Sequence, residues 1–152
     1  MAARTMPRVV AGLLAASVVA SFANAGAVNK LVAAGGSVTT TAGPVECDER
    51  DMVKKGDHIV IHYTGTIDQS SKTDTPGKKF DSSLDPRESP FAEDANKVPE
   101  PFDFTIGLGS VIDGWEFGLL GLCKGAKATL VVPPELGYDK QGMGGDIAGG
   151  AT

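Results

Sequence analysis

The stretch VIDGWEFGLLGLCKG, residues 111–125, combines the apolar spacing of a helix with four glycines: Gly114, Gly118, Gly121 and Gly125. Four apolar side chains recur at intervals that place them on one side of a helix of roughly two or three turns: Ile112, Trp115, Leu119 and Leu122. Each glycine inside a helix costs about 0.5–1 kcal/mol relative to alanine. The stretch therefore predicts either that a ligand or another chain segment comes close to this backbone, or that the helix is incomplete.

The segments on either side of this stretch have the pattern of β-strands. The best strand is HIVIHYTGTI (58–67), which is rich in β-branched and aromatic residues and alternates with period two. Shorter strands are predicted in three further places: KFDSS (79–83), PFDFTIG (101–107) and the start of KATLVVPPELG (127–137), where Pro133 and Pro134 stop the strand. VECDER (45–50) is a candidate first strand. Several strands, one short helix and long loops predict an α+β domain rather than alternating βαβ units.

The N-terminal residues have the features of a secretory signal peptide. Arg4 and Arg8 precede the apolar run Val9 to Ala20, and Ala23-Asn24-Ala25 fits a cleavage site. The run is too short to cross a hydrocarbon core, which needs about 20 residues. Residues 1–25 are therefore interpreted as a signal peptide cleaved after Ala25, with cleavage after Ala27 as the second choice. An uncleaved anchor or an organelle transit peptide is the alternative.

The next residues, 26–43, are small, weakly polar and rich in glycine and threonine, and are expected to be a flexible linker or N-terminal arm. The folded domain is then expected to begin near Pro44 and to occupy residues 44–152. Removal of residues 1–25 leaves 12 basic and 19 acidic residues, a net charge of −7. That charge disfavours nucleic acid as a partner. Beyond the first apolar run no stretch is long enough to span a membrane, so no membrane insertion of the mature protein is expected.

The two cysteines, Cys47 and Cys123, are expected to form a disulfide in the oxidising secretory compartment, with two buried free thiols as the alternative. No metal site and no cofactor are expected. His58 and His62 would share a strand face, but four residues of strand span roughly 13 Å, too far for one ion. The sequence also lacks the P-loop, the nucleophile elbow and the zinc-protease motif.

Five short blocks occur in one order along the chain: HYTG (62–65), KFDSS (79–83), PFDFTIG (101–107), VIDGWEFGL (111–119) and PPELGY (133–138). With these blocks the sequence resembles the FK506-binding (FKBP-type) peptidyl-prolyl cis-trans isomerases, from about Val45 to Thr152. The block GLLGLCKG (118–125) with its cysteine, and the upstream Cys47, resemble the members of the endoplasmic reticulum. The resemblance implies a five-stranded antiparallel β-sheet curled around one short α-helix, with a ligand pocket between them.

The resemblance also implies the residues of that pocket. Trp115 would form its floor, with Tyr63, Phe80 and Phe102 as walls and Asp81 as the polar group at its edge. Val111 and Ile112 would form the rim, where the Ile112 backbone N–H holds a ligand carbonyl. Tyr138 would offer its hydroxyl, and Ile147 would be the aliphatic residue of the following loop.

The implied function is cis–trans isomerisation of X-Pro bonds in folding secretory proteins, without a cofactor. The implied partners are proline-containing polypeptides and macrolides of the FK506 type, and the protein is expected to be a monomer in the lumen of the endoplasmic reticulum, with secretion as the second choice. One alternative is a weakly active or inactive peptide-binding chaperone of the same fold. Another is a disulfide-stapled secreted β-domain with no pocket function.

The sequence departs from the family pattern in several places. It ends at GGAT (149–152), before the family's final strand, which is interpreted as a fragment or as a short form with an impaired fold. Asp139 replaces a glycine, which predicts strain if that position needs a positive φ. Asp146 replaces an aliphatic residue. Insertions at 70–76 and 86–98 lengthen loops that the resemblance places near the pocket.

Overall fold

The computed structural model describes residues 30–85 and 98–152. The expected signal peptide at 1–25 and nearly all of the 86–98 insertion lie outside these residues. The described strands and helix are β1 (Ser37–Ala42), β2 (His58–Ile61), β3 (Thr64–Thr66), β4 (Lys79–Ser82), β5 (Phe102–Thr105), α2 (Asp113–Gly118) and β6 (Lys127–Val131). Two short 3-10 helices add to them, η1 (Glu49–Asp51) and η3 (Pro134–Leu136), and residues 30–33 are also helical. No helix in the described ranges is long and apolar enough to cross a membrane.

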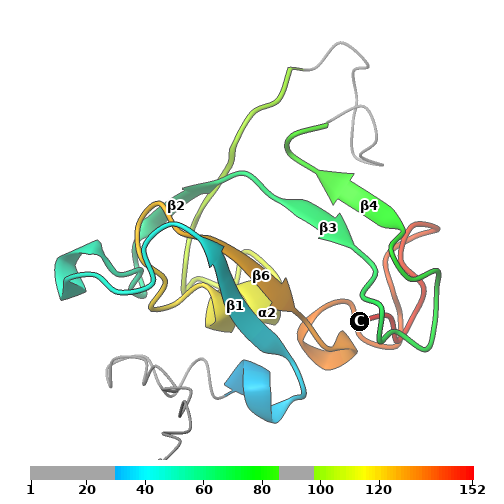
Figure 1. Cartoon of the computed structure of the whole chain (residues 1–152). Helices are drawn as coiled ribbons and strands as arrows, with labels where there is room; N and C mark the ends of the chain where they lie inside the picture. The colour runs from blue at the N-terminus through cyan, green and yellow to red at the C-terminus, as the bar shows by residue number, and fades with distance from the viewer. Residues whose placement is uncertain (1–29, 86–97) are drawn as a thin grey trace, which may run out of the picture.

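The strands pair in an antiparallel manner, which confirms the predicted α+β class. β1 pairs with β6, β2 with β5 and β3 with β4. In Figure 1, β3 follows β2 across the molecule with β4 above it, while β1 and β6 lie side by side in front of α2. The predicted strand 58–67 is divided into β2 and β3 at His62 and Tyr63. That break turns Tyr63 toward the helix, where its ring contacts Trp115.

The segment before Pro44 differs from the loose arm that the sequence predicted. Residues 37–42 form β1, with Ser37 opposite Val131 and Thr40 opposite Ala128 in β6. Leu31, in the helical turn before β1, is completely buried. The β-branched run SVTTT suits a strand, and a partner far along the chain supplies the pairing. The predicted first strand VECDER (45–50), in contrast, is not a strand. Cys47 lies there in an irregular segment that leads into η1.

The core consists of Ile59, Phe104 and Ile106, and the side chains of Trp115 and Leu119 pack against it. The opposite face of α2 explains two of the glycines in 111–125. A Cβ atom at Gly114 would lie 2.4 Å from Val132 Cγ1, and one at Gly118 would lie 2.5 Å from Leu130 Cδ2. The close neighbour of this backbone is therefore the segment containing β6. The glycines allow a short helix to lie against β6 while Trp115 points the other way.

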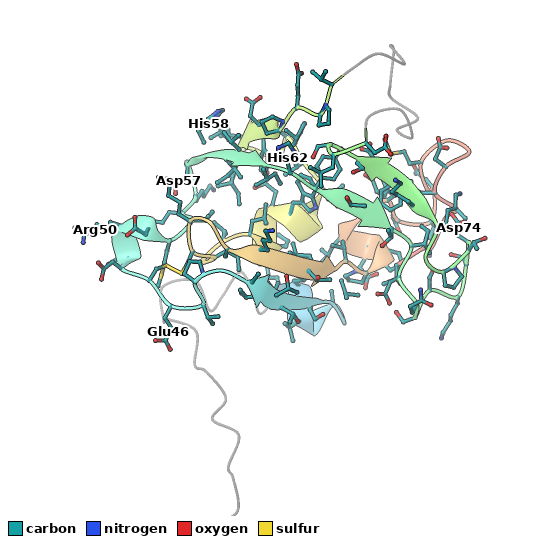
Figure 2. The ribbon with its side chains drawn as sticks, turned by 45° about the horizontal axis from the view of Figure 1, so that its top comes forward. Glu46, Arg50, Asp57, His58, His62 and Asp74 are labelled. Carbon is teal, nitrogen blue, oxygen red and sulfur yellow. A yellow bond between two sulfur atoms is a disulfide. The ribbon has the colours of Figure 1, made fainter. Side chains whose placement is uncertain are left out.

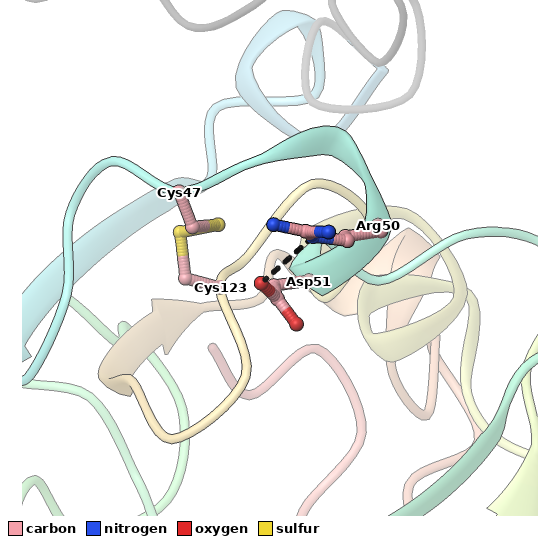
Figure 3. The surroundings of a disulfide bond; sticks show 4 residues. All are labelled: Cys47, Arg50, Asp51 and Cys123. Carbon is pink, nitrogen blue, oxygen red and sulfur yellow. Dashed lines mark ion pairs between the residues drawn. A yellow bond between two sulfur atoms is a disulfide. The ribbon is translucent and has the colours of Figure 1, made fainter.

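The expected disulfide is present between Cys47 and Cys123, with their Cα atoms 5.9 Å apart and a sequence separation of 76 (Figure 3). It joins the segment before η1 to the turn between α2 and β6. The neighbouring Arg50 and Asp51 form an exposed ion pair at 4.0 Å. The disulfide thus ties the N-terminal segment to the connection that leaves the helix.

Candidate functional site

The predicted site residues all line one open cavity of about 1930 Å³: Tyr63, Phe80, Asp81, Phe102, Val111, Ile112, Trp115, Tyr138 and Ile147. They come from five separate parts of the chain, so the fold gathers them from long range. The cavity exceeds the about 300–1,000 Å³ of an ordinary ligand site because it continues between β2 and β6, whose residues also line it. The aromatic residues among them contact one another and form the candidate binding part of the cavity.

Three rings enclose the indole of Trp115, one from the segment between β2 and β3 and two from β5. The ring centroid of Tyr63 lies 5.1 Å from that of Trp115 and the centroid of Phe102 lies 6.0 Å from it, both edge-on. Phe104 lies 5.8 Å from Trp115 in a tilted arrangement and is 7% exposed. The sequence analysis placed Phe104 only within the predicted strand 101–107, and alternation along a strand puts it on the same face as Phe102. Its position two residues after Phe102 is the signal that it supports the same ring.

A second aromatic pair forms another wall of the cavity. The rings of Phe80 and Tyr138 meet edge-on with centroids 6.4 Å apart. Phe80 lies in β4, and its ring occupies the space where a side chain at Gly65 would stand, since a Cβ atom there would be 2.6 Å from the ring. Gly65 in β3 therefore permits the position of Phe80.

Asp81 is the polar group among these rings. The Tyr63 hydroxyl donates a hydrogen bond to Asp81 Oδ2, and the backbone N–H of Ser82 donates to Asp81 Oδ1 at 2.8 Å. Burial raises the pKa of Tyr63 well above its ordinary value, and the hydrogen bond to Asp81 and its negative charge raise it further. Burial also raises the pKa of Tyr138, with a smaller effect of the Asp81 charge. Both phenols therefore stay protonated near neutral pH and can donate hydrogen bonds.

The rim of the cavity is formed where the chain enters α2. The Ile112 carbonyl accepts hydrogen bonds from the N–H groups of Trp115 at 2.9 Å and Glu116 at 3.1 Å. Within residues 30–85 and 98–152, the Ile112 N–H donates to no protein acceptor. It is therefore available to a carbonyl group of a ligand.

Glu116 does not line the cavity but supports its rim, a role that the sequence analysis missed. Its side chain is 7% exposed and accepts the backbone N–H groups of Gly107 at 2.5 Å and Gly109 at 2.8 Å. These bonds fix the turn that leads into Val111 and Ile112. An acidic residue between Trp115 and Phe117 in a short apolar helix was the only sequence signal of this role.

The loop after η3 brings Tyr138 and Ile147 to the cavity. Ile147 is 4% exposed, and its backbone forms an isolated bridge with Met143. Asp139 has φ of 50°, which lies in the left-handed region. This position therefore has the positive φ for which the replaced glycine would be better suited. Asp146 stands where the family often has an aliphatic residue. In this loop the buried aliphatic side chain comes from the next residue, Ile147.

Comparison with known proteins gives a consistent assignment. Residues 49–152 match the family described as FKBP-type peptidyl-prolyl cis-trans isomerase. "FK506-binding protein 2B" of Rhizopus delemar is 49% identical over 107 residues, which cover 70% of this chain and 42% of that protein. "FK506-binding protein 2" of Dictyostelium discoideum is 43% identical over 106 residues, covering 70% of this chain and 64% of that protein.

The human "Peptidyl-prolyl cis-trans isomerase FKBP2" is 43% identical over 99 residues, covering 65% of this chain and 56% of the human protein. The matched part of this chain thus spans 42–64% of the length of these relatives. All of the cavity residues named above fall inside the family match.

Proposed function

This chain belongs to the FKBP-type peptidyl-prolyl cis-trans isomerase family, and we propose that it catalyses rotation about X-Pro peptide bonds in polypeptide clients. The observation that carries the proposal is the enclosure of Trp115 by Tyr63 and Phe102, with the Tyr63–Asp81 hydrogen bond at its edge. This arrangement offers an apolar, aromatic surface of the kind that suits a proline ring, next to polar groups that can orient the flanking backbone.

The physical basis of catalysis is the loss of amide resonance during rotation. Rotation about a peptide bond faces a barrier of about 18–20 kcal/mol, although the two forms of an X-Pro bond differ by only about 0.5–1 kcal/mol. Resonance places negative charge on the carbonyl oxygen, and water stabilises this planar form. A pocket that removes water and fits the twisted imide better than either planar form lowers the barrier by differential binding.

The residues of the cavity have separate roles in this catalysis. Trp115, Tyr63, Phe80 and Phe102 hold the proline ring and exclude water. The N–H of Ile112 binds a carbonyl of the substrate and fixes its direction. The protonated hydroxyl of Tyr138 donates a second hydrogen bond to the substrate backbone, while Asp81 acts through Tyr63 by holding that ring in place.

The clients are proline-containing segments of proteins that fold in the secretory pathway, and the protein acts as a monomer in the lumen of the endoplasmic reticulum. The Cys47–Cys123 disulfide supports an oxidising compartment. The same apolar pocket is suited to macrolides of the FK506 type.

The test is the refolding of a protein whose slow phase, of about 10–100 s, is limited by proline isomerisation. The purified chain should accelerate this phase in proportion to its concentration, and Trp115→Leu should reduce the acceleration strongly while the folded state persists. Asp48→Asn is the control and should act like the wild type, because Asp48 is exposed, pairs with Arg50 and is not among the residues that line the cavity. Binding of an unfolded proline-containing chain without acceleration would instead favour a chaperone without isomerase activity.

A further inference from the structure

The loop 68–78, which contains the 70–76 insertion, lies against the end of the chain at 146–152. In Figure 1 the green loop after β3 and the red segment run side by side at the right. Backbone and side-chain hydrogen bonds join them: the Asp68 N–H donates to the Thr152 carbonyl at 2.7 Å, and the Thr152 N–H donates to Ser71 Oγ at 3.2 Å. Asp74 lies at this end of the molecule and Arg50 at the other (Figure 2).

Asp74 is the centre of this contact. Its side chain is only 9% exposed, although it belongs to a polar loop. The carboxylate accepts the Ala148 N–H at 2.8 Å through Oδ2 and the Thr75 N–H at 2.7 Å through Oδ1. The backbone of Asp74 has φ of 65°, a conformation that aspartate tolerates better than most residues.

Lys78 completes the contact from the same loop. Its Nζ donates to the Asp146 carbonyl at 2.6 Å and lies 3.4 Å from Asp74 Oδ1. The two charged side chains thus fix Asp146 and Ala148, the two neighbours of Ile147. Ile147 itself is 4% exposed and lines the cavity with Tyr138.

The segment that carries Ile147 has backbone hydrogen bonds of its own, from the Met143 N–H to the Ile147 carbonyl at 2.9 Å and from the Gly150 N–H to the Asp139 carbonyl at 2.8 Å, but it is rich in glycine. Glycines stand at 142, 144, 145, 149 and 150, and glycine loses more conformational freedom on ordering than any other residue. A wall that is ordered before the ligand arrives lowers the entropic cost of binding. Hydrogen bonds from charged groups are stronger than those between neutral groups, which suits them to this task.

We propose that Asp74 and Lys78 are positioning residues that form a clasp on residues 146–148 and thereby hold Ile147 in the wall of the substrate cavity. The clasp sets how tightly a segment around proline is bound, and in this respect it rests on the proposed function. We expect Ile147 to contact the planar and the twisted forms of the substrate equally, so loss of the clasp should weaken binding more than it slows the isomerisation step.

The test uses a graded pair of substitutions and a matched control in the full chain. Asp74→Asn keeps the shape and an acceptor oxygen but removes the charge. Asp74→Gly removes the carboxylate and still accepts the positive φ, so backbone strain does not confuse the result. Asp48→Asn removes one exposed carboxylate elsewhere. The probe is a short Leu-Pro peptide, with binding followed by Trp115 fluorescence and catalysis by cis–trans exchange.

Asp74→Gly should raise both the peptide Kd and KM about three- to tenfold while kcat stays within about twofold, with a smaller effect for Asp74→Asn. Hydrogen exchange of the Ala148 amide should be faster than in the wild type, most of all in Asp74→Gly and less so in Asp74→Asn. Amides of β2 and β5 should exchange as slowly as in the wild type. Equal Kd for Asp74→Gly and Asp48→Asn would overturn the clasp, as would a fall in kcat with unchanged KM. If the wild-type chain binds the peptide but does not accelerate its cis–trans exchange, the proposed isomerase function is overturned. The clasp is then still tested by comparing the peptide Kd of Asp74→Gly with that of the wild type.

Discussion

The Tyr63 hydroxyl and the Asp81 carboxylate, which are 18 residues apart, form a hydrogen bond at the edge of the aromatic enclosure. Tyr63 follows β2, and Asp81 lies in β4 opposite Gly65 of β3. The bond therefore depends on the β3–β4 register as well as on the break between β2 and β3. It joins the segment between β2 and β3, where the Tyr63 ring contacts Trp115, to β4, which also carries Phe80.

Substitution of Tyr63 by phenylalanine should lower the free energy of unfolding by about 1–2 kcal/mol, because Asp81 Oδ2 loses its donor in a partly buried site. Tyr138→Phe is the matched control, since the Tyr138 hydroxyl donates no hydrogen bond within the described residues, and it should change stability by about 0.5 kcal/mol or less. Denaturant unfolding of both variants measures the difference. Equal stabilities would show that the Tyr63–Asp81 bond contributes nothing to the folded state.

The only two tyrosines of the chain are both in the cavity, which gives an alkaline titration a simple meaning. Their pKa values are raised in the folded state above the ordinary value of 10.0. The unfolded chain therefore loses these protons first, and the stability that they contribute is complete below pH 10 and falls as the pH rises above it. Ultraviolet absorption should show tyrosinate forming at a higher pH in the folded protein than in denaturant. The same titration curve in both states would contradict the buried environment of the two tyrosines.

Gly114→Ala should destabilise the protein by about 1–3 kcal/mol through overpacking, although alanine is the better helix former. The reason is the 2.4 Å separation that a Cβ atom would have from Val132 Cγ1. The double variant Gly114→Ala/Val132→Ala should recover part of the loss, because the added methyl then has space. A thermodynamic cycle of the four proteins measures this coupling. Additive effects would mean that the two residues do not meet.

Reduction of the Cys47–Cys123 disulfide should cost about 4 kcal/mol of unfolding free energy, on the chain-entropy view of a closed loop of this length. Urea unfolding with and without a reductant measures the effect. The variant in which both cysteines are serine should already have the lower stability and should not respond to reductant. An unchanged midpoint for the wild type in reductant would show that the crosslink does not stabilise the fold.

Much of the site was predictable from the sequence because its residues occur in short recognisable blocks. The residues HYTG, KFDSS and VIDGW placed Tyr63, Asp81 and Trp115 in one pocket, and the structure brings them together. The α+β class followed from several predicted strands and one short helix, the antiparallel pairing from the resemblance to the family, and the disulfide from the only two cysteines in an oxidising compartment.

What the sequence did not predict depends on long-range pairing. Residues 37–42 resembled a linker because local composition contains no information about β6, yet Thr41 Oγ1 donates to the Lys127 carbonyl across 86 residues of sequence. Glu116 and Asp74 were missed for the same reason. Both act by accepting backbone N–H groups of distant loops, and any backbone can supply those groups.

The most direct measurement of the central claim is the cis–trans exchange rate of a short Leu-Pro peptide, followed by NMR with the purified chain in catalytic amount. The account predicts that the exchange rate rises in proportion to protein concentration, and that Trp115→Leu removes most of the increase while Asp48→Asn does not. An exchange rate that remains at its uncatalysed value, with a chain that is folded and binds the peptide, would contradict the isomerase assignment.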